Sequence, residues 1–587
     1  MDTVNMKING KEITVPANAT IMEAAHIAGI DIPSLCYLKG LNEIGSCRLC
    51  LVEVEKAKGL CAACVYPVSE GMSVWTNSAK VLKARKMTLE LILSNHRMDC
   101  LTCHRNGTCE LQLLAKQLGI TEVPFQKTRP EPEIEASAVH LVRDNSKCVL
   151  CRRCVAACKA QGVSVIGPNN RGFNTSIGCE FDRDLVDVGC ISCGQCIVAC
   201  PTGALYEKDQ TDLVWDAIAD PTKHVVVGTA PSVRATLGEC FDYAPGTDIE
   251  GKMVTALRQI GFDAVFDIDT AADFTIIEEG TELLRRLKGE GGPLPLITSC
   301  SPGWIRFCEQ YCSDFLPNLS SCKSPQSMFG ALMKTYYAEK MGIDPKDIFV
   351  VSIMPCTAKK YEAQRPALKE GDYADIDVSL TTRELASMIK RLGMQYTNLP
   401  ESEFDPLFGI STGASVIFGA SGGVMEAALR SVVSLVLGGD EKAPLEFKEV
   451  RGLENTKEAT YELPGKTVRV AVVSGTANAQ ALLDLVRKGE KEYDFIEVMC
   501  CPGGCINGGG QPWQPAKIRS FVDLPALRAA ALYRNDEAKE LRRSHLNPIV
   551  KEVYAEYLGE WGGEKAEEIL HTTYEAQDKY RVARNNL

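Results

Sequence analysis

Cysteine is the residue that most constrains this chain, because 26 of its 587 residues are cysteines and they are unevenly spread. Seventeen of them lie within the first 200 residues. Disulfides stabilise small secreted domains, whereas clustered cysteines in a large chain without an export signal are typically metal ligands. No apolar segment of a signal peptide follows the first residues, Met-Asp-Thr-Val-Asn-Met-Lys. We therefore expect metal clusters in the first third of a cytoplasmic protein.

Charge and composition exclude several other classes of protein. The formal net charge of −12 opposes a nucleic-acid partner, which usually needs a basic surface. No segment approaches the ~20 consecutive apolar residues of a membrane span. The hydrophobic share of 45% and the charged share of 24% are typical of globular proteins. At ~150 residues per domain, a chain of this length predicts about four domains.

The first set of cysteines lies in residues 1–78 and follows the pattern C-x10-C-x2-C-x13-C. Its members are Cys36, Cys47, Cys50 and Cys64. Four thiolates divided in this way suit a [2Fe-2S] cluster, although zinc also accepts four thiolates. Cys61 is a rival ligand to Cys64, and we favour Cys64. Earlier in this segment, Asn9-Gly10 predicts a β-hairpin, and Thr20 with Glu23 predicts a capped helix.

A second set, in residues 79–126, combines one histidine with three cysteines. Its members are His96, Cys100, Cys103 and Cys109. A histidine in place of one thiolate lowers the negative charge on an iron–sulfur cluster, and zinc is the alternative occupant. His104 is the rival to His96, and we favour His96.

The most specific cysteine pattern occurs twice in residues 139–209. The two runs are Cys148-x2-Cys151-x2-Cys154-x3-Cys158 and Cys190-x2-Cys193-x2-Cys196-x3-Cys200-Pro201. In two-cluster ferredoxins the fourth cysteine of each run binds the other cluster. This rule assigns one [4Fe-4S] cluster to Cys148, Cys151, Cys154 and Cys200, and the second to Cys190, Cys193, Cys196 and Cys158. We expect both clusters to transfer electrons.

The sequence changes at about residue 210 to alternating strands and helices. Runs rich in β-branched residues are typical of buried parallel strands, and they occur at 225–227, 348–353, 468–474 and 495–499. A helical pattern follows at 479–486. These features predict an α/β domain over 210–520. Residues 127–138, rich in Pro and Glu, predict a linker, and 521–587 predict a charged tail with helices over 537–543 and 549–558.

Three motifs in the carboxyl-terminal half are long and specific. They are Thr298-Ser-Cys-Ser-Pro-Gly-Trp304, Met354-Pro-Cys-Thr-Ala-Lys-Lys360 and Glu497-Val-Met-Cys-Cys-Pro-Gly-Gly-Cys505-Ile-Asn-Gly-Gly-Gly-Gln-Pro512. They resemble the signature motifs of the [FeFe]-hydrogenases, and the likeness covers nearly the whole chain. The domain order resembles that of the large clostridial-type and NAD(P)-linked multi-subunit catalytic subunits.

The resemblance implies a multidomain α+β and α/β fold. The expected order is a β-grasp-like [2Fe-2S] domain, a small domain with one His and three Cys ligands, a two-cluster ferredoxin domain, and a large α/β domain. The implied cofactors are one [2Fe-2S] cluster, three [4Fe-4S] clusters and an H-cluster. An H-cluster is a [4Fe-4S] cube joined through one cysteine to a di-iron site that carries CO, cyanide and a dithiolate bridge.

By the same resemblance, Cys356, Cys501 and Cys505 bind the cube, and Cys505 bridges to the di-iron site. The family's first motif usually has two adjacent cysteines, the second of which is a cube ligand. Here the pair is Cys300-Ser301, while Cys500 has been added before Cys501. Either Ser301 binds weakly, Cys300 or Cys500 supplies the fourth thiolate, or the cube is altered. We hypothesise that a thiolate substitutes, because oxygen is a harder and poorer ligand for such iron.

The resemblance also implies a route for protons and a set of contacts to the di-iron site. The proton route matches Cys300, Glu279, Ser320 and Glu282, with Arg286 near its outer end. Glu279 and Glu282 are three residues apart, so one helix face would present both. The residues that match those holding the cyanides are Lys359, Ser232 and Gln326, and Met354 and Met499 would pack around the site.

The expected activity is reversible H2 oxidation and proton reduction, with electrons relayed through the amino-terminal clusters. Ferredoxin or NAD(P)-linked electron-transfer subunits would receive them, and maturation proteins would install the di-iron site. A hydrogen-sensing regulatory hydrogenase with low turnover is the alternative. An electron-wiring subunit without a catalytic site would leave the three motifs unexplained. No G-x-G-x-x-G follows a predicted strand, so nicotinamide or flavin binding on this chain is not expected.

Overall fold

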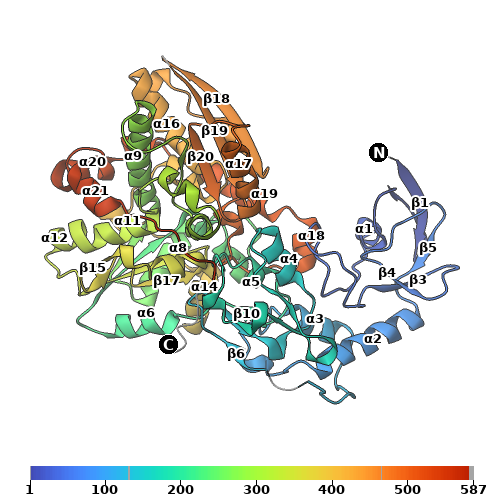
Figure 1. The fold of residues 1–587 in the computed structure, drawn as a ribbon. Helices are drawn as coiled ribbons and strands as arrows, with labels where there is room; N and C mark the ends of the chain where they lie inside the picture. Colours follow the sequence, from blue (N-terminus) through green and yellow to red (C-terminus); the bar gives the residue numbers. More distant parts are fainter. Residues whose placement is uncertain (1, 130–131, 465, 581–587) are drawn as a thin grey trace, which may run out of the picture.

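A computed structural model describes residues 2–129, 132–464 and 466–580 of the chain. Residues 130–131 of the expected linker and 581–587 of the expected tail lie outside the described residues. Figure 1 shows a large carboxyl-terminal body, with the amino-terminal domain standing to one side of it. The ferredoxin-type region lies between the two. Within the described residues, no helix is long and apolar enough to span a membrane.

The amino-terminal domain is a five-stranded sheet with the order β2-β1-β5-β3-β4. The strands are β1 (Thr3–Ile8), β2 (Lys11–Pro16), β3 (Leu51–Val54), β4 (Leu60–Ala62) and β5 (Ser73–Trp75). The hairpin expected at Asn9-Gly10 forms, because both residues adopt the positive φ that a tight hairpin turn requires. Helix α1 (Ile21–Ile27) begins with the expected capping box of Thr20 and Glu23.

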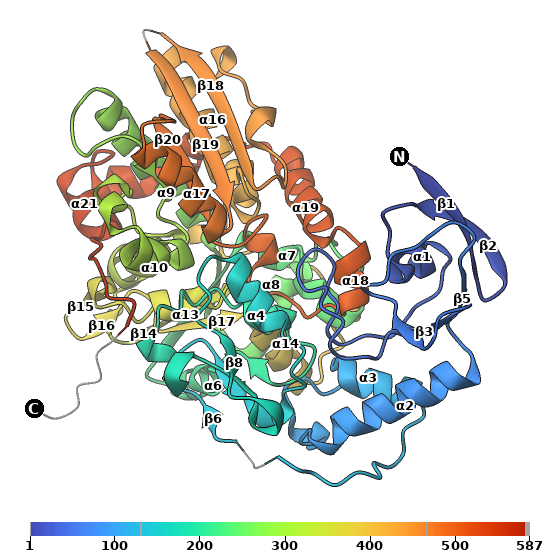
Figure 2. The ribbon, with the colours of Figure 1, turned by 45° about the vertical axis from the view of Figure 1, so that its right-hand side comes forward.

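Two helices lead from this domain to the ferredoxin-type region, α2 (Ala79–Ser94) and α3 (Glu110–Gln117) (Figure 2). That region has the sheet β10-β7-β6, made of β10 (Leu205–Tyr206), β7 (Val142–Asp144) and β6 (Ile134–Glu135). Helices α4 (Arg153–Ala160) and α5 (Gln195–Ala199) each carry the later part of one cysteine run, and they contact each other.

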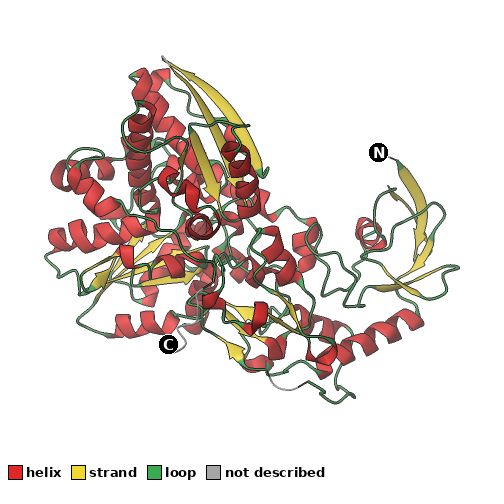
Figure 3. Cartoon of the chain, in the orientation of Figure 1, coloured by secondary structure: helices red, strands yellow, loops and turns green. Residues whose placement is uncertain are grey.

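The carboxyl-terminal body contains two four-stranded sheets (Figure 3). The first, in the order β12-β11-β14-β17, is entirely parallel: β12 (Ala264–Asp267), β11 (His224–Thr229), β14 (Ile348–Met354) and β17 (Val378–Thr381). The second is β13-β20-β19-β18: β13 (Leu296–Ile297), β20 (Phe495–Met499), β19 (Lys466–Ser474) and β18 (Thr456–Leu463). Only β18 is antiparallel to its neighbour. All four strands expected in this region are present.

Long buried helices pack between and beside these sheets. Helix α9 (Ile268–Leu287) contacts α11 (Pro325–Leu332) and α16 (Gly423–Leu437). Most of α9 is buried, including acidic residues that a surface helix would expose to water. Burial on this scale puts polar side chains into a low-dielectric interior, where each needs a partner or a function.

The tail differs in part from the expectation. Helix α19 (Leu524–Ala538) ends before 539, so the helix expected over 537–543 is wrong. The physical reason is Asp536, which is fully buried and accepts hydrogen bonds from Arg430 and from Arg542, so the chain turns back toward α16. The expected helix at 549–558 is present as α20 (Pro548–Val553) and the helical turn Tyr554–Leu558.

Residues 564–571 of the tail pack on the carboxyl-terminal body. His571 pairs with Cys322 in an isolated β-bridge, and its ring contacts Ser321 (2.8 Å) and Glu278 (2.9 Å). Helix α21 (Glu564–Leu570) precedes this contact and packs on α11. The tail therefore covers the outer side of α9.

We expect Arg430→Met to destabilise the carboxyl-terminal body. Arg430 is fully buried and pairs with Asp536 and Glu426, each at 2.8 Å. Removing it leaves buried carboxylates with fewer partners, at a cost of about 3 kcal/mol. Scanning calorimetry should show the unfolding transition of this body lowered by roughly 5 °C.

The matched control is Arg469→Met, since Arg469 is about half exposed and pairs with the exposed Glu492. An exposed pair of this kind contributes at most ~1 kcal/mol. Equal shifts for the two variants would contradict a structural role for the buried pair.

Candidate functional site

The candidate site is a buried cavity in the carboxyl-terminal body. Strands of both sheets supply its lining directly after their carboxyl ends. From the first sheet, β11 leads to Ser232 and β14 leads to Cys356; from the second, β13 leads to Cys300 and β20 leads to Cys501. Carboxyl ends of parallel strands are where α/β folds usually build sites.

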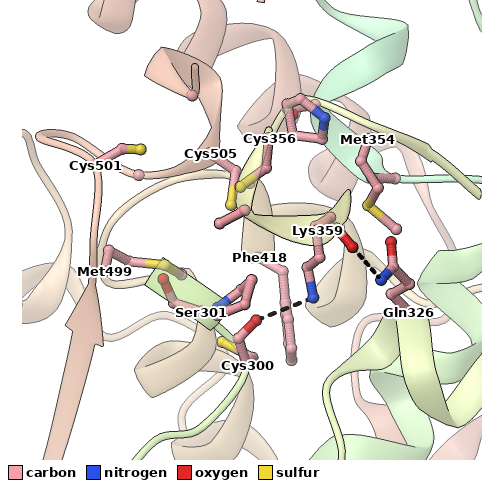
Figure 4. A pocket seen from close by; sticks show the side chains of 18 of the residues that line it. Cys300, Ser301, Gln326, Met354, Cys356, Lys359, Phe418, Met499, Cys501 and Cys505 are labelled. Carbon is pink, nitrogen blue, oxygen red and sulfur yellow. Dashed lines mark hydrogen bonds between the residues drawn. The ribbon is translucent and has the colours of Figure 1, made fainter. Parts of the chain in front are cut away.

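Three cysteines expected to bind one cluster line this cavity together. The thiols of Cys356 and Cys505 lie side by side, and that of Cys501 points toward them (Figure 4). Burial, and then the neighbouring thiols of Cys501 and Cys505, raise the pKa of Cys356. The neighbouring thiols raise this pKa because thiolates gathered in a buried pocket would repel one another. Bound iron would remove that repulsion.

Glycines bring the backbone close around the thiols. A Cβ atom at Gly508 would lie 2.2 Å from the carbonyl oxygen of Pro355, and one at Gly510 would lie 2.8 Å from the carbonyl carbon of the same residue. At Gly504, which has a φ of +101°, a Cβ would lie 2.7 Å from the amide nitrogen of Ser421. The loop that carries Cys501 and Cys505 thus fits only without side chains at these positions. The thiols and this close-fitting loop suit an iron–sulfur cluster.

Of the side chains labelled in Figure 4, only Lys359 carries a positive charge, and it points into the cavity. It is 7% exposed, and its Nζ donates to Ser324 (2.7 Å), to Glu362 (2.8 Å) and to the carbonyl oxygen of Cys300 (3.3 Å). A buried ammonium group held in this way can bind an anionic ligand of the cofactor. Gln326, fully buried, donates to the same Glu362 oxygen at 2.9 Å.

The other expected contact residues also line the cavity. Ser232 is fully buried and accepts a hydrogen bond from Gln511 at 3.3 Å. Met354 and Met499 end β14 and β20, and both side chains face the cavity (Figure 4). The structure therefore brings together all of the expected cavity residues.

Sequence reasoning missed two residues of this site. Glu362 holds both Lys359 and Gln326, and its spacing of three residues from Lys359 on a helix could have indicated the pair. Phe418 lines the cavity from the turn Ile417–Gly419, which lies far from every motif in the sequence. Nothing in its local pattern distinguishes it from an ordinary core residue.

Glu279 lies on α9 beside the cavity and is almost completely buried, with 1% exposure. Neither carboxylate oxygen has a hydrogen-bond partner among the described residues. Burial, and then repulsion by Glu282, raise the pKa of Glu279 to about 8. A buried carboxyl group with this pKa can hold or release a proton near neutral pH.

The remaining residues of the expected proton route continue from Glu279 toward the surface. Ser320 donates to Glu282 at 2.8 Å, and Arg286 donates to the other oxygen of Glu282 at 2.5 Å. Glu282 is partly exposed, whereas Ser320 is fully buried. Cys300 lies at the inner end, where burial and then Glu279 raise the pKa of its thiol. Hydrogen bonds thus join Ser320, Glu282 and Arg286, while Glu279 lies near both Cys300 and Glu282.

The two cysteine runs of the ferredoxin-type region form two groups of thiols. Burial raises the pKa of Cys154 well above its usual value, and its neighbouring thiols, in order of effect, are Cys151, Cys148 and Cys200. Burial likewise raises the pKa of Cys196, and the thiols that add to this effect are, in order, Cys193, Cys190, Cys158 and Cys200. The grouping brings the last cysteine of each run to the other run, as the crossed arrangement requires.

In the amino-terminal domain the thiols of the first set also converge. The sulfurs of Cys50 and Cys64 are 3.3 Å apart, and hydrogen bonds from the thiols of Cys47 and Cys64 lower the pKa of Cys36. The rival Cys61 is turned toward the carbonyl oxygen of Gly59.

In the second set, burial lowers the pKa of His96 to about 4, so its imidazole is neutral and can bind a metal. Cys103 lies close enough to Cys109 to raise the pKa of that thiol, after the larger effect of burial. Cys100 begins the helical turn Cys100–Thr102. The rival His104 instead stacks on Tyr206, with ring centroids 4.0 Å apart.

Comparison with family models assigns a known type to each region. Residues 223–509 match the carboxyl-terminal domain of the iron-only hydrogenase large subunit, and 523–577 match the iron hydrogenase small subunit. Residues 1–79 match a 2Fe-2S iron–sulfur cluster binding domain, 85–124 the NADH-ubiquinone oxidoreductase-G iron–sulfur binding region, and 147–204 a 4Fe-4S dicluster domain.

Curated relatives match along nearly the whole chain. The NADP-reducing hydrogenase subunit HndD of Solidesulfovibrio fructosivorans is 45% identical, covering 98% of this chain and 99% of its own. Iron hydrogenase 1 of Clostridium pasteurianum is 44% identical, covering 97% and 99%. A solved structure of apo [FeFe]-hydrogenase HydA1 from Chlamydomonas reinhardtii is 42% identical with a TM-score of 0.55, covering 62% of this chain and 99% of its own.

We expect Gly508→Ala to impair cluster loading in the cavity. Gly508 has an ordinary φ of −66°, so the substitution adds only the steric clash with Pro355. That clash displaces the loop next to Cys356. Iron analysis of the purified protein should show a loss of up to about four irons per chain, the content of one [4Fe-4S] cluster.

The control is Gly59→Ala, where a Cβ would meet nothing within 4 Å. Its iron content should equal that of the wild type. Full iron loading in Gly508→Ala would show that the cavity does not hold a cluster against this loop.

Proposed function

This chain belongs to the iron-only hydrogenases, and we propose that it splits and forms H2 in the cavity between its two sheets, where Cys356, Cys501 and Cys505 hold an H-cluster. It is an oxidoreductase that acts on H2, with amino-terminal iron–sulfur domains that relay electrons. The observation that supports this location best is the convergence of three thiols and a buried lysine after strands of both sheets. The comparisons give no support to the hydrogen-sensing alternative.

We infer a cofactor set from the grouping of thiols. The [2Fe-2S] cluster is assigned to Cys36, Cys47, Cys50 and Cys64, and one [4Fe-4S] cluster to His96, Cys100, Cys103 and Cys109. The two ferredoxin-type clusters take the crossed sets of Cys148, Cys151, Cys154 and Cys200, and of Cys190, Cys193, Cys196 and Cys158. Each set lies within a region that matches an iron–sulfur family model.

When bound, the H-cluster supplies the iron at which the H–H bond is broken or made. The chain's own residues hold and orient it. Lys359 offers a buried positive charge, and Gln326 and Ser232 offer polar side chains on the same cavity wall. Met354, Met499 and Phe418 give an apolar lining that excludes water from the reacting atoms.

Protons reach and leave the cavity through the row of residues on α9 and its neighbours. The thiol of Cys300 stands at the cavity, and the carboxyl group of Glu279 can take or give a proton at a pH near its pKa of about 8. Ser320 is bonded to Glu282 at 2.8 Å, which passes the proton outward. Arg286 donates a hydrogen bond to Glu282 and holds its carboxylate in place.

Electrons leave the cavity by a different route, through the ferredoxin-type region. Cys193 lines the same cavity as Cys501, so the second ferredoxin-type cluster lies next to the H-cluster site. From there electrons pass toward the amino-terminal domain and on to electron-transfer subunits. The relative HndD is named as a subunit of an NADP-reducing hydrogenase, which favours an NAD(P)-linked partner over free ferredoxin. We place the protein in the cytoplasm, where its 26 thiols stay reduced.

The activity is tested with protein matured to carry the di-iron site. Reduced viologen should drive H2 evolution, and infrared spectroscopy should show CO and cyanide bands. Intact bands without turnover in either direction would contradict the proposed catalytic function.

We expect Glu279→Gln to lower turnover by about 10²-fold or more, because an amide cannot carry the proton in either direction. In the wild type, H2 evolution needs Glu279 protonated, so its rate should fall as the pH rises through about 8. H2 oxidation needs the carboxylate form, so its rate should rise over the same range. Steady-state rates of H2 evolution and H2 oxidation, measured at saturating viologen and divided by the amount of H-cluster detected by infrared spectroscopy, check both pH dependences.

Glu278→Gln is the matched control, since Glu278 is the preceding residue and is equally buried, but contacts Gly562 and His571 of the tail. It should retain its turnover per H-cluster. An undiminished rate in Glu279→Gln would remove Glu279 from the proton route.

A further inference from the structure

We propose that Cys500 is the fourth ligand of the cube, in place of the serine at position 301. This inference rests on the proposed H-cluster site. A [4Fe-4S] cluster normally takes four ligands from the protein, and Cys356, Cys501 and Cys505 account for three. The other candidates that line the cavity near these thiols are the hydroxyl of Ser301 and the thiols of Cys300, Cys500 and Cys193.

The hydroxyl of Ser301 is already used for a different purpose. Its Oγ accepts a hydrogen bond from the backbone N–H of Cys500 at 3.2 Å. Ser301 stands immediately before α10 (Pro302–Tyr311) and so ties the start of this helix to the end of β20. A neutral hydroxyl is a harder and poorer iron ligand than a thiolate. The hydroxyl of Ser301 therefore faces the backbone of Cys500.

The side chain of Cys500 lies beside the cysteines that would bind the cube. Its thiol lines the same cavity as the thiols of Cys193 and Cys501, and the residue is only 4% exposed. A Cβ atom at Gly303 would lie 2.6 Å from the Cys500 sulfur. The first turn of α10 therefore lacks a side chain where this sulfur lies. On binding iron, Cys500 would give up its thiol proton, as every thiolate ligand does.

The other two thiols are less suited to this role. Cys300 lies at the opposite end of the cavity, beside Lys359, and its thiol is close to Glu279. Cys193 belongs to a complete ferredoxin-type set and is needed for that cluster. The position of Cys500 near Cys193 has a further consequence. It puts the proposed ligand of the cube beside a ligand of the neighbouring cluster.

The test uses the full chain produced without maturation proteins, so that only iron–sulfur clusters are assembled. We compare the wild type with Cys500→Ala, Ser301→Ala and the double variant Ser301→Cys/Cys500→Ala. The measurements are iron per chain and electron paramagnetic resonance of the reduced and oxidised protein. Cys308→Ala is the control for loss of a buried thiol, because Cys308 is fully buried in the packing of α10 and its thiol donates to the carbonyl oxygen of Cys312.

Cys500→Ala should lose the cube signal and up to about four irons, or retain a three-iron cluster that is detected in the oxidised protein. Ser301→Ala and Cys308→Ala should keep the wild-type iron content. The double variant should regain the cube, because it returns a thiolate to the neighbouring position. This rescue separates lost coordination from simple misfolding.

An intact cube in Cys500→Ala would overturn the proposal, as would loss of the cube in Ser301→Ala alone. Failure of the double variant to regain the cube would also overturn it. None of these results depends on turnover. Absence of H2 turnover in the matured wild type would instead count against the proposed function and leave the ligand assignment standing.

Discussion

The meeting of strand ends from two sheets is the constraint on which the rest of this structure depends. Cys356 follows β14 of one sheet, and Cys501 follows β20 of the other, so neither sheet alone can gather the thiols. Thiolates confined in a buried cavity repel one another, and iron is what makes their proximity favourable. The tight glycine loop after β20 and the buried helices around it hold this geometry against that repulsion.

Most of the buried charged side chains discussed above are paired with one another. Lys359 is neutralised by Glu362, which also holds Gln326, so a single carboxylate orients two residues of the cavity wall. Glu279 is the exception, because its oxygens have no hydrogen-bond partner among the described residues and its pKa is raised to about 8. A stability argument cannot account for such a group, whereas a proton-transfer role can. The small-subunit-like tail covers the outer side of the same helix through His571.

Much of this organisation could be predicted from sequence, because cysteine spacing and motif length are local properties. The hairpin at Asn9-Gly10, the capping box at Thr20 and the main strands all follow local patterns that tertiary packing did not override. The expected helix over 537–543 failed because a long-range bond between Asp536 and Arg430 ends it. Phe418 and the split into two sheets could not be foreseen, since both depend on contacts between distant segments. The sequence shows a serine at position 301 and an additional cysteine at position 500, but it does not show how these two residues lie relative to each other.

The central claim is that an iron cofactor occupies the cavity bounded by Cys356, Cys501 and Cys505. Anomalous scattering at the iron edge, measured on crystals of the matured protein, tests it most directly because it locates iron without assuming any ligand. We predict iron density within that cavity, next to the density of the second ferredoxin-type cluster. Iron confined to the amino-terminal clusters, with the three thiols apart or joined in a disulfide, would contradict the account.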